Sequence, residues 1–442
     1  MGFYDVSSGR SAQDLFEFLS TKFRKFNLHS KLVAQTYDGA SVMSGEVNGL
    51  QAKIKSIAPQ AMFIHCYAHV FNLVLSNACS SIQQVKVFFS TLSGFSSYFS
   101  KSTKRTQVLE HIGGNRIPSN VATRWNFTSR AVLTVNNNKD KLLETFDFII
   151  NSRDFDDKTI REAVGLKAFL EDPQNIFFLE IFSLIFHQTD TVFSILQNRN
   201  TDIVKARNLL QNTLSKIREF RSNTTYFDTI YEKLDTAALH SKRRRKGVEM
   251  TDKTQQLRQI FFEILDIIAT QIEVRFCDVE KLHFFDLLNI SKFPIFAKEF
   301  PHDLLKNLTT QYNIFDINQL KSELSAMYGN DIIENCASPY EMLTFFHDYD
   351  LKLCMPEVFK LLCICVVLPV TSASAERSFS ALKRIKNYIR NTTGQTRLSN
   401  MAKISIEKSF IKSQDENVFI DDVIDHFAEQ KSRRIPLIYK KL

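Results

Sequence analysis

Apolar residues recur along this chain at two different spacings. Residues 11–26 carry apolar side chains three or four positions apart, which predicts a helix. Residues 31–37 (KLVAQTY) and 62–65 (MFIH) are short apolar runs that predict strands, and the first ends at an Asp-Gly turn signal. Residues 41–57 and 66–75 predict helices that follow the two strands. A strand, a helix and a strand of these lengths predict a parallel pair with a helical crossover.

From about residue 81 to residue 359 the spacing is helical almost throughout. Three apolar stripes stand out, and each predicts a long amphipathic helix. The stripes are Phe178, Ile181, Ile185, Val192 and Ile195, then Ile203, Leu210, Leu214 and Ile217, then Leu257, Phe261, Ile264, Ile268 and Ile272. The third begins near Thr251 and Asp252, which suit an N-cap. Stripes of this kind are typical of a protein core rather than of a cofactor site.

Composition narrows the class of protein. A chain of 442 residues exceeds the ~250–300 at which single cores stop growing, so we expect two or three modules. Its 56 basic and 48 acidic residues give a charge of +8, a mild bias toward polyanions. Seven cysteines without a CxxC pair predict neither a disulfide framework nor a zinc finger, and favour a reduced compartment. The apolar run at 361–370 is shorter than the ~20 residues of a bilayer span, so we expect no membrane partner.

One dense basic run interrupts the helical pattern. It consists of Lys242, Arg243, Arg244, Arg245 and Lys246. Such a run serves as a nuclear-localisation patch or a phosphate contact, or it is a solvated loop between two helices. The run leaves both interpretations open.

The C-terminal part opens another helix. After Pro369 the segment 371–380 (TSASAERSFS) supplies Ser and Thr side chains that suit a helix start. Glu376 falls in the predicted first turn, where the helix dipole favours a carboxylate. The helix is expected to run to about residue 389, and residues 398–410 predict the next one.

Four motifs, in this order, resemble the hAT transposase superfamily, and within it the group related to MYM-type zinc-finger proteins. Residues 36–40 (TYDGA) resemble the segment of the second catalytic aspartate, and residues 66–69 (CYAH) resemble the C-x-x-H helix. Residues 123–125 (TRW) resemble the Arg-Trp pair. Residues 374–380 (SAERSFS), with Ile385, Arg397 and Leu398 beyond them, resemble the C-terminal dimerisation segment that holds the catalytic glutamate.

The resemblance implies an RNase H-like fold interrupted by a large helical insertion. We therefore expect an α/β plus all-α protein with a partial RNase H-like segment at 1–130, a helical insertion at 131–355 and a dimerisation region at 356–442. The family uses two aspartates and one glutamate to hold Mg²⁺, a hard ion that prefers oxygen ligands. Asp38 and Glu376 match two of these three positions.

The first aspartate of that set has no match in this sequence. Residues 1–6 are expected to be a remnant of the third strand, so Asp5 would lie roughly 14 Å from the strand of Asp38 at ~4.8 Å per strand step. Asp14 lies inside the following predicted helix. We therefore expect a truncated or decayed copy with an incomplete metal site, no cofactor and an open edge on the Asp38 strand. A complete site would bind Mg²⁺.

The matched residues also have structural interpretations. Asp38 is either a catalytic-lineage carboxylate or a turn residue, and Glu376 either the third carboxylate or a helix-start acid. Cys66 and His69 are expected to be buried structural residues, with His69 near Asp38, because two ligands do not make a zinc site.

Arg124 and the single tryptophan, Trp125, have two interpretations of their own. By resemblance they contact the DNA end, where the indole would stack on a base. The alternative is a tryptophan that packs in the protein core.

Three functions remain in competition. The first is a non-catalytic dimerisation module. Its apolar face would be buried against the insertion and a partner copy, and it consists of Phe379, Leu382, Ile385 and Leu398. The second is an active transposase that cuts DNA, if upstream sequence completes the site. The third is a nuclear DNA-binding regulator whose affinity comes from the DNA backbone and falls steeply with salt. We expect self-association, a nuclear location and no enzymatic activity for this chain.

Overall fold

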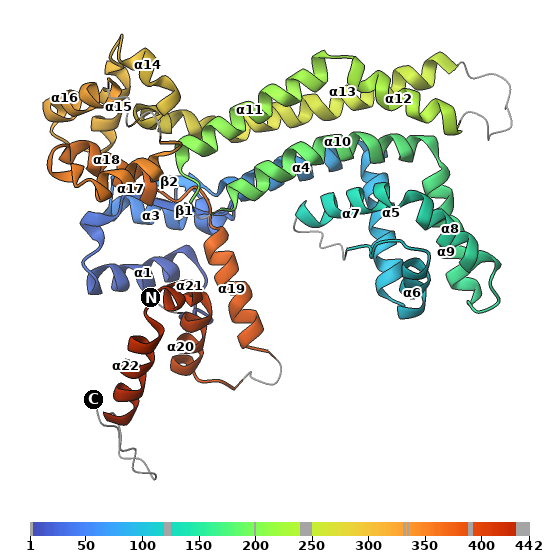
Figure 1. Ribbon diagram of the computed structural model, residues 1–442, viewed down its shortest axis with the longest axis horizontal. Helices are drawn as coiled ribbons and strands as arrows, with labels where there is room; N and C mark the ends of the chain where they lie inside the picture. Colours follow the sequence, from blue (N-terminus) through green and yellow to red (C-terminus); the bar gives the residue numbers. More distant parts are fainter. Residues whose placement is uncertain are drawn as a thin grey trace. The chain divides into compact units, whose positions relative to one another are not determined.

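The computed structural model describes residues 3–118, 125–198, 200–238, 250–329, 333, 336–387 and 392–429 (Figure 1). Its contacts divide the chain into two compact units. The terminal unit comprises Met1–Lys22 and Ala373–Leu442, and the central unit comprises Phe23–Ser372.

A small parallel sheet opens the central unit. Strand β1 (Ala34–Tyr37) pairs with β2 (Met62–His65), with Ala34 opposite Met62 and Tyr37 opposite His65. The crossover between them contains α2 (Ser41–Ser44) and α3 (Leu50–Ile57). The predicted parallel pair and the bounds of the second strand are confirmed, while the first strand begins three residues later than expected.

The crossover is broken where one helix was expected from residue 41 to residue 57. The chain folds closely on itself between Gly45 and Gly49, whose N–H donates to the Gly45 carbonyl at 3.1 Å. A Cβ atom on Gly49 would lie 2.4 Å from the Gly45 nitrogen, so only glycine fits this contact. The two glycines therefore end one helix and start the next.

The expected strand remnant at residues 1–6 was wrong for the residues that the structure describes. Phe3–Val6 is irregular, and it belongs to the terminal unit rather than to the unit that holds the sheet. The Phe3 N–H donates to Ser399 Oγ at 3.1 Å, and its carbonyl accepts a hydrogen bond from Gln395. Side chains of a helix thus satisfy backbone groups that a neighbouring strand would otherwise bind.

The central unit continues as a long series of helices. They are α4 (Tyr67–Ser81), α5 (Gln83–Ser100), α6 (Thr103–His111), α7 (Trp125–Asn137), α8 (Lys139–Asn151), α9 (Asp157–Glu171), α10 (Pro173–Leu196), α11 (Ile203–Ser222), α12 (Thr225–Ala238) and α13 (Met250–Arg275). The three predicted stripes lie on α10, α11 and α13, and α11 and α13 run side by side (Figure 1). The expected N-cap at residues 251–252 concerns side chains outside the described set.

Helix α10 is the centre of this core. Asp172 caps it by accepting a hydrogen bond from the Gln174 N–H at 2.9 Å, and Pro173 occupies the first helical position. Phe177, Phe178, Phe182 and Phe186 are at most 1% exposed. Among the described helices α10 alone is long and apolar enough to cross a membrane, yet 61% of its apolar window is buried in the protein.

Shorter helices complete the central unit before the chain leaves it at Ser372. They are η1 (His29–Lys31), which precedes β1, and η2 (Cys277–Leu288), η3 (Ile290–Lys292), α14 (Phe293–Phe296), α15 (His302–Gln311), α16 (Ile317–Tyr328), α17 (Pro339–Asp348), η5 (Leu351–Leu353) and α18 (Pro356–Val367). The described chain is therefore mostly helical, with a small parallel sheet where the sequence predicted a partial RNase H-like segment.

The terminal unit holds the last helices of the chain. They are α19 (Ala373–Ile385), α20 (Gln395–Ile406), α21 (Lys408–Ser413) and α22 (Glu416–Glu429), and most of α1 (Ala12–Lys25) lies in the same unit. The rings of Phe3 and Phe379 meet edge to face with centroids 6.0 Å apart, so the N-terminal segment packs on α19. The predicted helix from residue 398 to residue 410 is two helices that meet at Glu407.

Candidate functional site

The first candidate carboxylate, Asp38, lies directly after β1. Its side chain is exposed, and its Oδ1 accepts a hydrogen bond from the Ala40 N–H at 3.2 Å. This contact is typical of an Asp side chain in a turn, as in the turn interpretation of Asp38. The turn leaves the exposed Asp38 side chain accessible at the strand end.

A segment from the far end of the chain docks at this edge of the sheet. Thr36 donates its hydroxyl proton to the Pro369 carbonyl, and the Tyr67 N–H donates to the Val370 carbonyl at 2.9 Å. The Ser372 N–H donates to Cys66 Sγ at 3.2 Å. Residues 369–372 are thus fixed beside the carboxyl ends of both strands, more than 300 residues away in sequence.

Cys66 takes part in these contacts, and its structural role stays a prediction. The thiol is fully buried at the start of α4, and it also lies 3.6 Å from the Thr371 hydroxyl. His69, one turn further along α4, is half-buried. Its expected contact with Asp38 stays a prediction, as does its structural role.

The second candidate carboxylate, Glu376, lies in the first turn of α19 and is exposed. It follows Ser372 by four residues, but it belongs to the terminal unit, whereas Asp38 belongs to the central unit. Among the described residues no group of three or more His, Cys, Asp or Glu side chains is placed to hold a metal ion.

The candidate DNA contacts fall mostly outside the described residues. Arg124 and the basic run from Lys242 to Lys246 lie there, and so does the side chain of Trp125, although α7 begins at that residue. Their assignment to DNA binding stays a prediction.

The four residues predicted for dimerisation do not share one environment. Leu398 is 6% exposed and belongs to the interior of the terminal unit, while Leu382 and Ile385 are half-buried. Phe379 is 63% exposed. Within this unit, therefore, Phe379 presents an apolar surface that the chain does not cover, and Leu398 supports the unit from inside.

Sequence reasoning missed further exposed apolar residues of the terminal unit. Ile404 on α20 is 63% exposed and Phe410 on α21 is 65% exposed. Helix α22 exposes a whole stripe that includes Val423 and Ile424. The helical spacing of that stripe was visible in the sequence, but its exposure was not.

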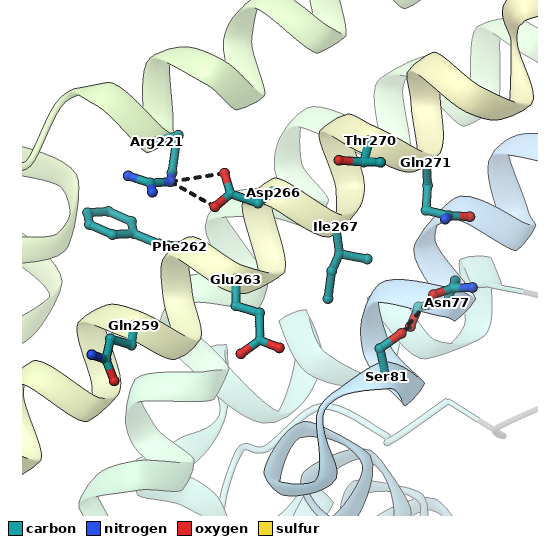
Figure 2. Close-up of a pocket in the computed structure, with 10 residues that line it drawn as sticks. All are labelled: Asn77, Ser81, Arg221, Gln259, Phe262, Glu263, Asp266, Ile267, Thr270 and Gln271. Carbon is teal, nitrogen blue, oxygen red and sulfur yellow. Dashed lines mark hydrogen bonds and ion pairs between the residues drawn. The ribbon is translucent and has the colours of Figure 1, made fainter.

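The pocket drawn in Figure 2 lies between α4, α11 and α13, with a volume of about 530 Å³. Arg221 from α11 donates to both carboxylate oxygens of Asp266, at 3.0 and 3.2 Å, and lies 4.0 Å from the centre of the Phe262 ring. This guanidinium is thus already engaged by α13. The ion pair joins α11 to α13 at the edge of the pocket.

A comparison with known protein families finds a match in the last third of the chain. Residues 318–410 match the hAT family C-terminal dimerisation region. The match begins in α16 and ends in α21, so it includes the docked segment 369–372, Glu376 and Phe379. The match relates the C-terminal part of the chain to the hAT-superfamily transposases, and the MYM-type grouping and the loss of the first strands stay predictions.

Proposed function

We propose that this hAT-related chain, which is transposon-derived, acts by self-association through its C-terminal dimerisation region. The observation that carries the proposal is the exposed apolar surface of the terminal unit inside the matched region. Phe379, Ile404 and Phe410 lie on three successive helices and are each more than 60% exposed.

Exposed groups of this size favour association in water. Burial of a Phe or Ile side chain contributes roughly 1.5–3 kcal/mol relative to full exposure, and part of that is offset by the ordering costs of binding. A dimer in the micromolar range requires a binding free energy of about 8 kcal/mol. Three such groups on one unit supply part of it, and neighbouring contacts supply the rest.

The test compares two exposed phenylalanines. Phe379→Asp places a charge in the proposed interface, while Phe148→Asp makes the same change at a residue of α8 that is 54% exposed and outside the matched region. Sedimentation velocity over a concentration series measures the dimer dissociation constant. We expect Phe379→Asp to raise it about 10-fold or more, a loss of at least ~1.4 kcal/mol, and Phe148→Asp to leave it unchanged.

Two results would contradict this proposal. One is a wild-type chain that sediments as a monomer at every concentration. The other is an equal effect of both substitutions, which would assign the change to added charge rather than to the interface.

We also infer that β1, its crossover and β2 belong to an RNase H-like sheet. The parallel pairing and the position of Asp38 directly after β1 support this inference. An experimental structure of a longer chain in which no upstream strand pairs with β1 would count against it.

The alternative function is metal-dependent cleavage of DNA. The docking of residues 369–372 favours it, because it ties the residues that precede Glu376 to the strand end that carries Asp38. The self-association proposal expects no nicking of DNA by this chain in Mg²⁺. Nicking by the wild-type chain that is lost in Glu376→Gln would establish the enzyme instead.

A nuclear DNA-binding role rests on the charge of +8 and on the run from Lys242 to Lys246. Such binding would come from phosphate contacts, so its affinity should fall steeply as salt rises. Binding to one DNA sequence that does not depend on salt would contradict this phosphate-driven mode of binding.

A further inference from the structure

Helix α22 carries an apolar stripe in its middle part. Phe419 and Val423 are four residues apart, as are Ile420 and Ile424, so the four side chains form one continuous face. Their exposed fractions are 37%, 52%, 45% and 41% in the order Phe419, Val423, Ile420 and Ile424. The chain therefore leaves this face largely open to solvent.

The opposite face of the same helix is acidic. At 3.6 residues per turn Asp421, Asp422 and Asp425 point away from the apolar stripe. The positions that flank the stripe, Asn417 and His426, carry no acid. The helix is thus amphipathic between residues 419 and 425, with Asp421, Asp422 and Asp425 on the side opposite the apolar stripe.

A helix of this length needs support from another surface. Asp415 caps it, since its Oδ1 accepts from the Asn417 and Val418 N–H groups at 3.0 and 3.2 Å. Fourteen residues are nevertheless close to the ~12–15 below which an isolated helix is marginal in water. Most helical stability in proteins comes from packing of the apolar face, so a partner for this face would stabilise α22.

We propose that the α22 stripe packs on the α22 stripe of a second copy of this chain. This rests on the proposed self-association and extends it, because the matched dimerisation region ends at residue 410 and α22 begins at Glu416. The surface would continue from Phe410, 65% exposed on α21, onto the helix that follows.

The distribution of charge on α22 favours a second copy of the chain as the partner. In a two-fold pair each stripe contacts its own copy, so a self-complementary face without like charges is required. The stripe and its flanks, Asn417 and His426, carry no acid and so meet that requirement, while Asp421 and Asp422 are exposed on the outer side. Helices that bind anionic membranes or phosphate backbones carry Lys and Arg on the polar face, whereas this polar face is acidic.

The test uses two substitutions in α22 that change the charge equally. Ile424→Lys adds one positive charge to the stripe, and Asp422→Asn removes one negative charge from the outer face. Both residues are exposed, so neither change leaves a cavity, and far-UV circular dichroism checks that the chain stays folded. Sedimentation velocity should show a dimer dissociation constant raised about 10-fold by Ile424→Lys and changed less than about 2-fold by Asp422→Asn.

Comparison with Phe379→Asp separates this inference from the proposed function. If Phe379→Asp weakens the dimer and Ile424→Lys does not, the α22 pairing is overturned while self-association stands. If only Ile424→Lys weakens it, the α22 pairing stands and the Phe379 surface is overturned. A wild-type chain that is always monomeric overturns both.

Hydrogen exchange gives an independent readout. The amides of α22 should become protected as the wild-type concentration rises through the dissociation constant, and they should stay unprotected in Ile424→Lys. Protection that appears only when lipid vesicles are added, at any protein concentration, would overturn the proposal in favour of a membrane partner.

Discussion

Helices α10 and α22 both carry apolar residues at helical spacing, and they lie in different environments. On α10 the rings of Phe178 and Phe182 are at most 1% exposed, and they pack against Phe88 with centroids 5.4 and 6.0 Å away. On α22, Val423 is 52% exposed and Ile424 is 41% exposed. The first helix finds its partners inside its own unit, whereas the second presents its stripe at the surface.

This difference shows what an amphipathic pattern does and does not specify. The spacing requires that one face of a helix be covered, but it does not say which surface covers it. In the central unit other helices of the same chain supply that surface. In the terminal unit we propose that a second copy supplies it, on a helix that follows the region matching a dimerisation family.

The largest expected effect is a difference in the free energy of unfolding between two phenylalanine substitutions, one in each unit. Phe182→Ala should lower the free energy of unfolding by about 3–5 kcal/mol, because it removes a fully buried ring and leaves a cavity. Phe379→Ala should change the stability of the monomer by less than about 0.5 kcal/mol, since that side chain is already exposed. Urea unfolding at low protein concentration measures both. Similar losses would mean that the two regions do not differ as described.

A smaller loss is expected from a buried charge of the central unit. Asp286 is 3% exposed and binds Arg207, itself 5% exposed, at 2.7 Å, along with Lys292 at 2.6 Å. Asp286→Ala should lower the free energy of unfolding by about 3 kcal/mol, because it leaves the Arg207 guanidinium buried without its carboxylate. Lys292 is 37% exposed and can turn to water, which limits the loss.

The matched double variant tests this explanation. Replacing both partners, as in Asp286→Ala with Arg207→Met, should recover part of the stability, because no charge then remains buried. A double variant that is less stable than Asp286→Ala would contradict this account.

The smallest effect concerns Asp190 on α10. Burial raises the pKa of this carboxyl above its ordinary value, and a hydrogen bond with Ser129 opposes that shift. The folded state therefore favours the protonated form, so stability is full below the unfolded pKa and declines as pH rises through the folded pKa. Asp190→Asn resembles the protonated form, and its stability relative to wild type should increase with pH. Urea unfolding from mildly acidic to mildly alkaline pH checks this, and a flat difference would contradict it.

Local features of the fold followed closely from the sequence. The run 62–65 is bounded by turns and a helix start, and β2 has those limits. The apolar stripes predicted the positions of α10, α11 and α13, because the helical spacing of each stripe extends over many turns. The motif at 374–380 indicated the dimerisation family that residues 318–410 match. The proposed domain limits at residues 130 and 355 stay predictions.

Other expectations were wrong where the answer depended on distant residues. The segment Phe3–Val6 has the composition of a short strand, but Ser399 and Gln395 bind its backbone instead. Leu398 and Phe379 belong to similar apolar patterns, yet one is buried and the other exposed. No local spacing distinguishes these outcomes, because each depends on which distant segment packs against the residue in the folded chain.

The sequence by itself determined the helices, the parallel strand pair and the family motif, since each depends on backbone preferences and side-chain spacing within a few turns. Only the tertiary structure decided that residues 369–372 bind beside Thr36, Cys66 and Tyr67, and that α22 keeps its apolar face exposed. Burial and long-range hydrogen bonds are properties of pairs of segments. The sequence shows which groups need partners, and the tertiary structure determines which of them are paired.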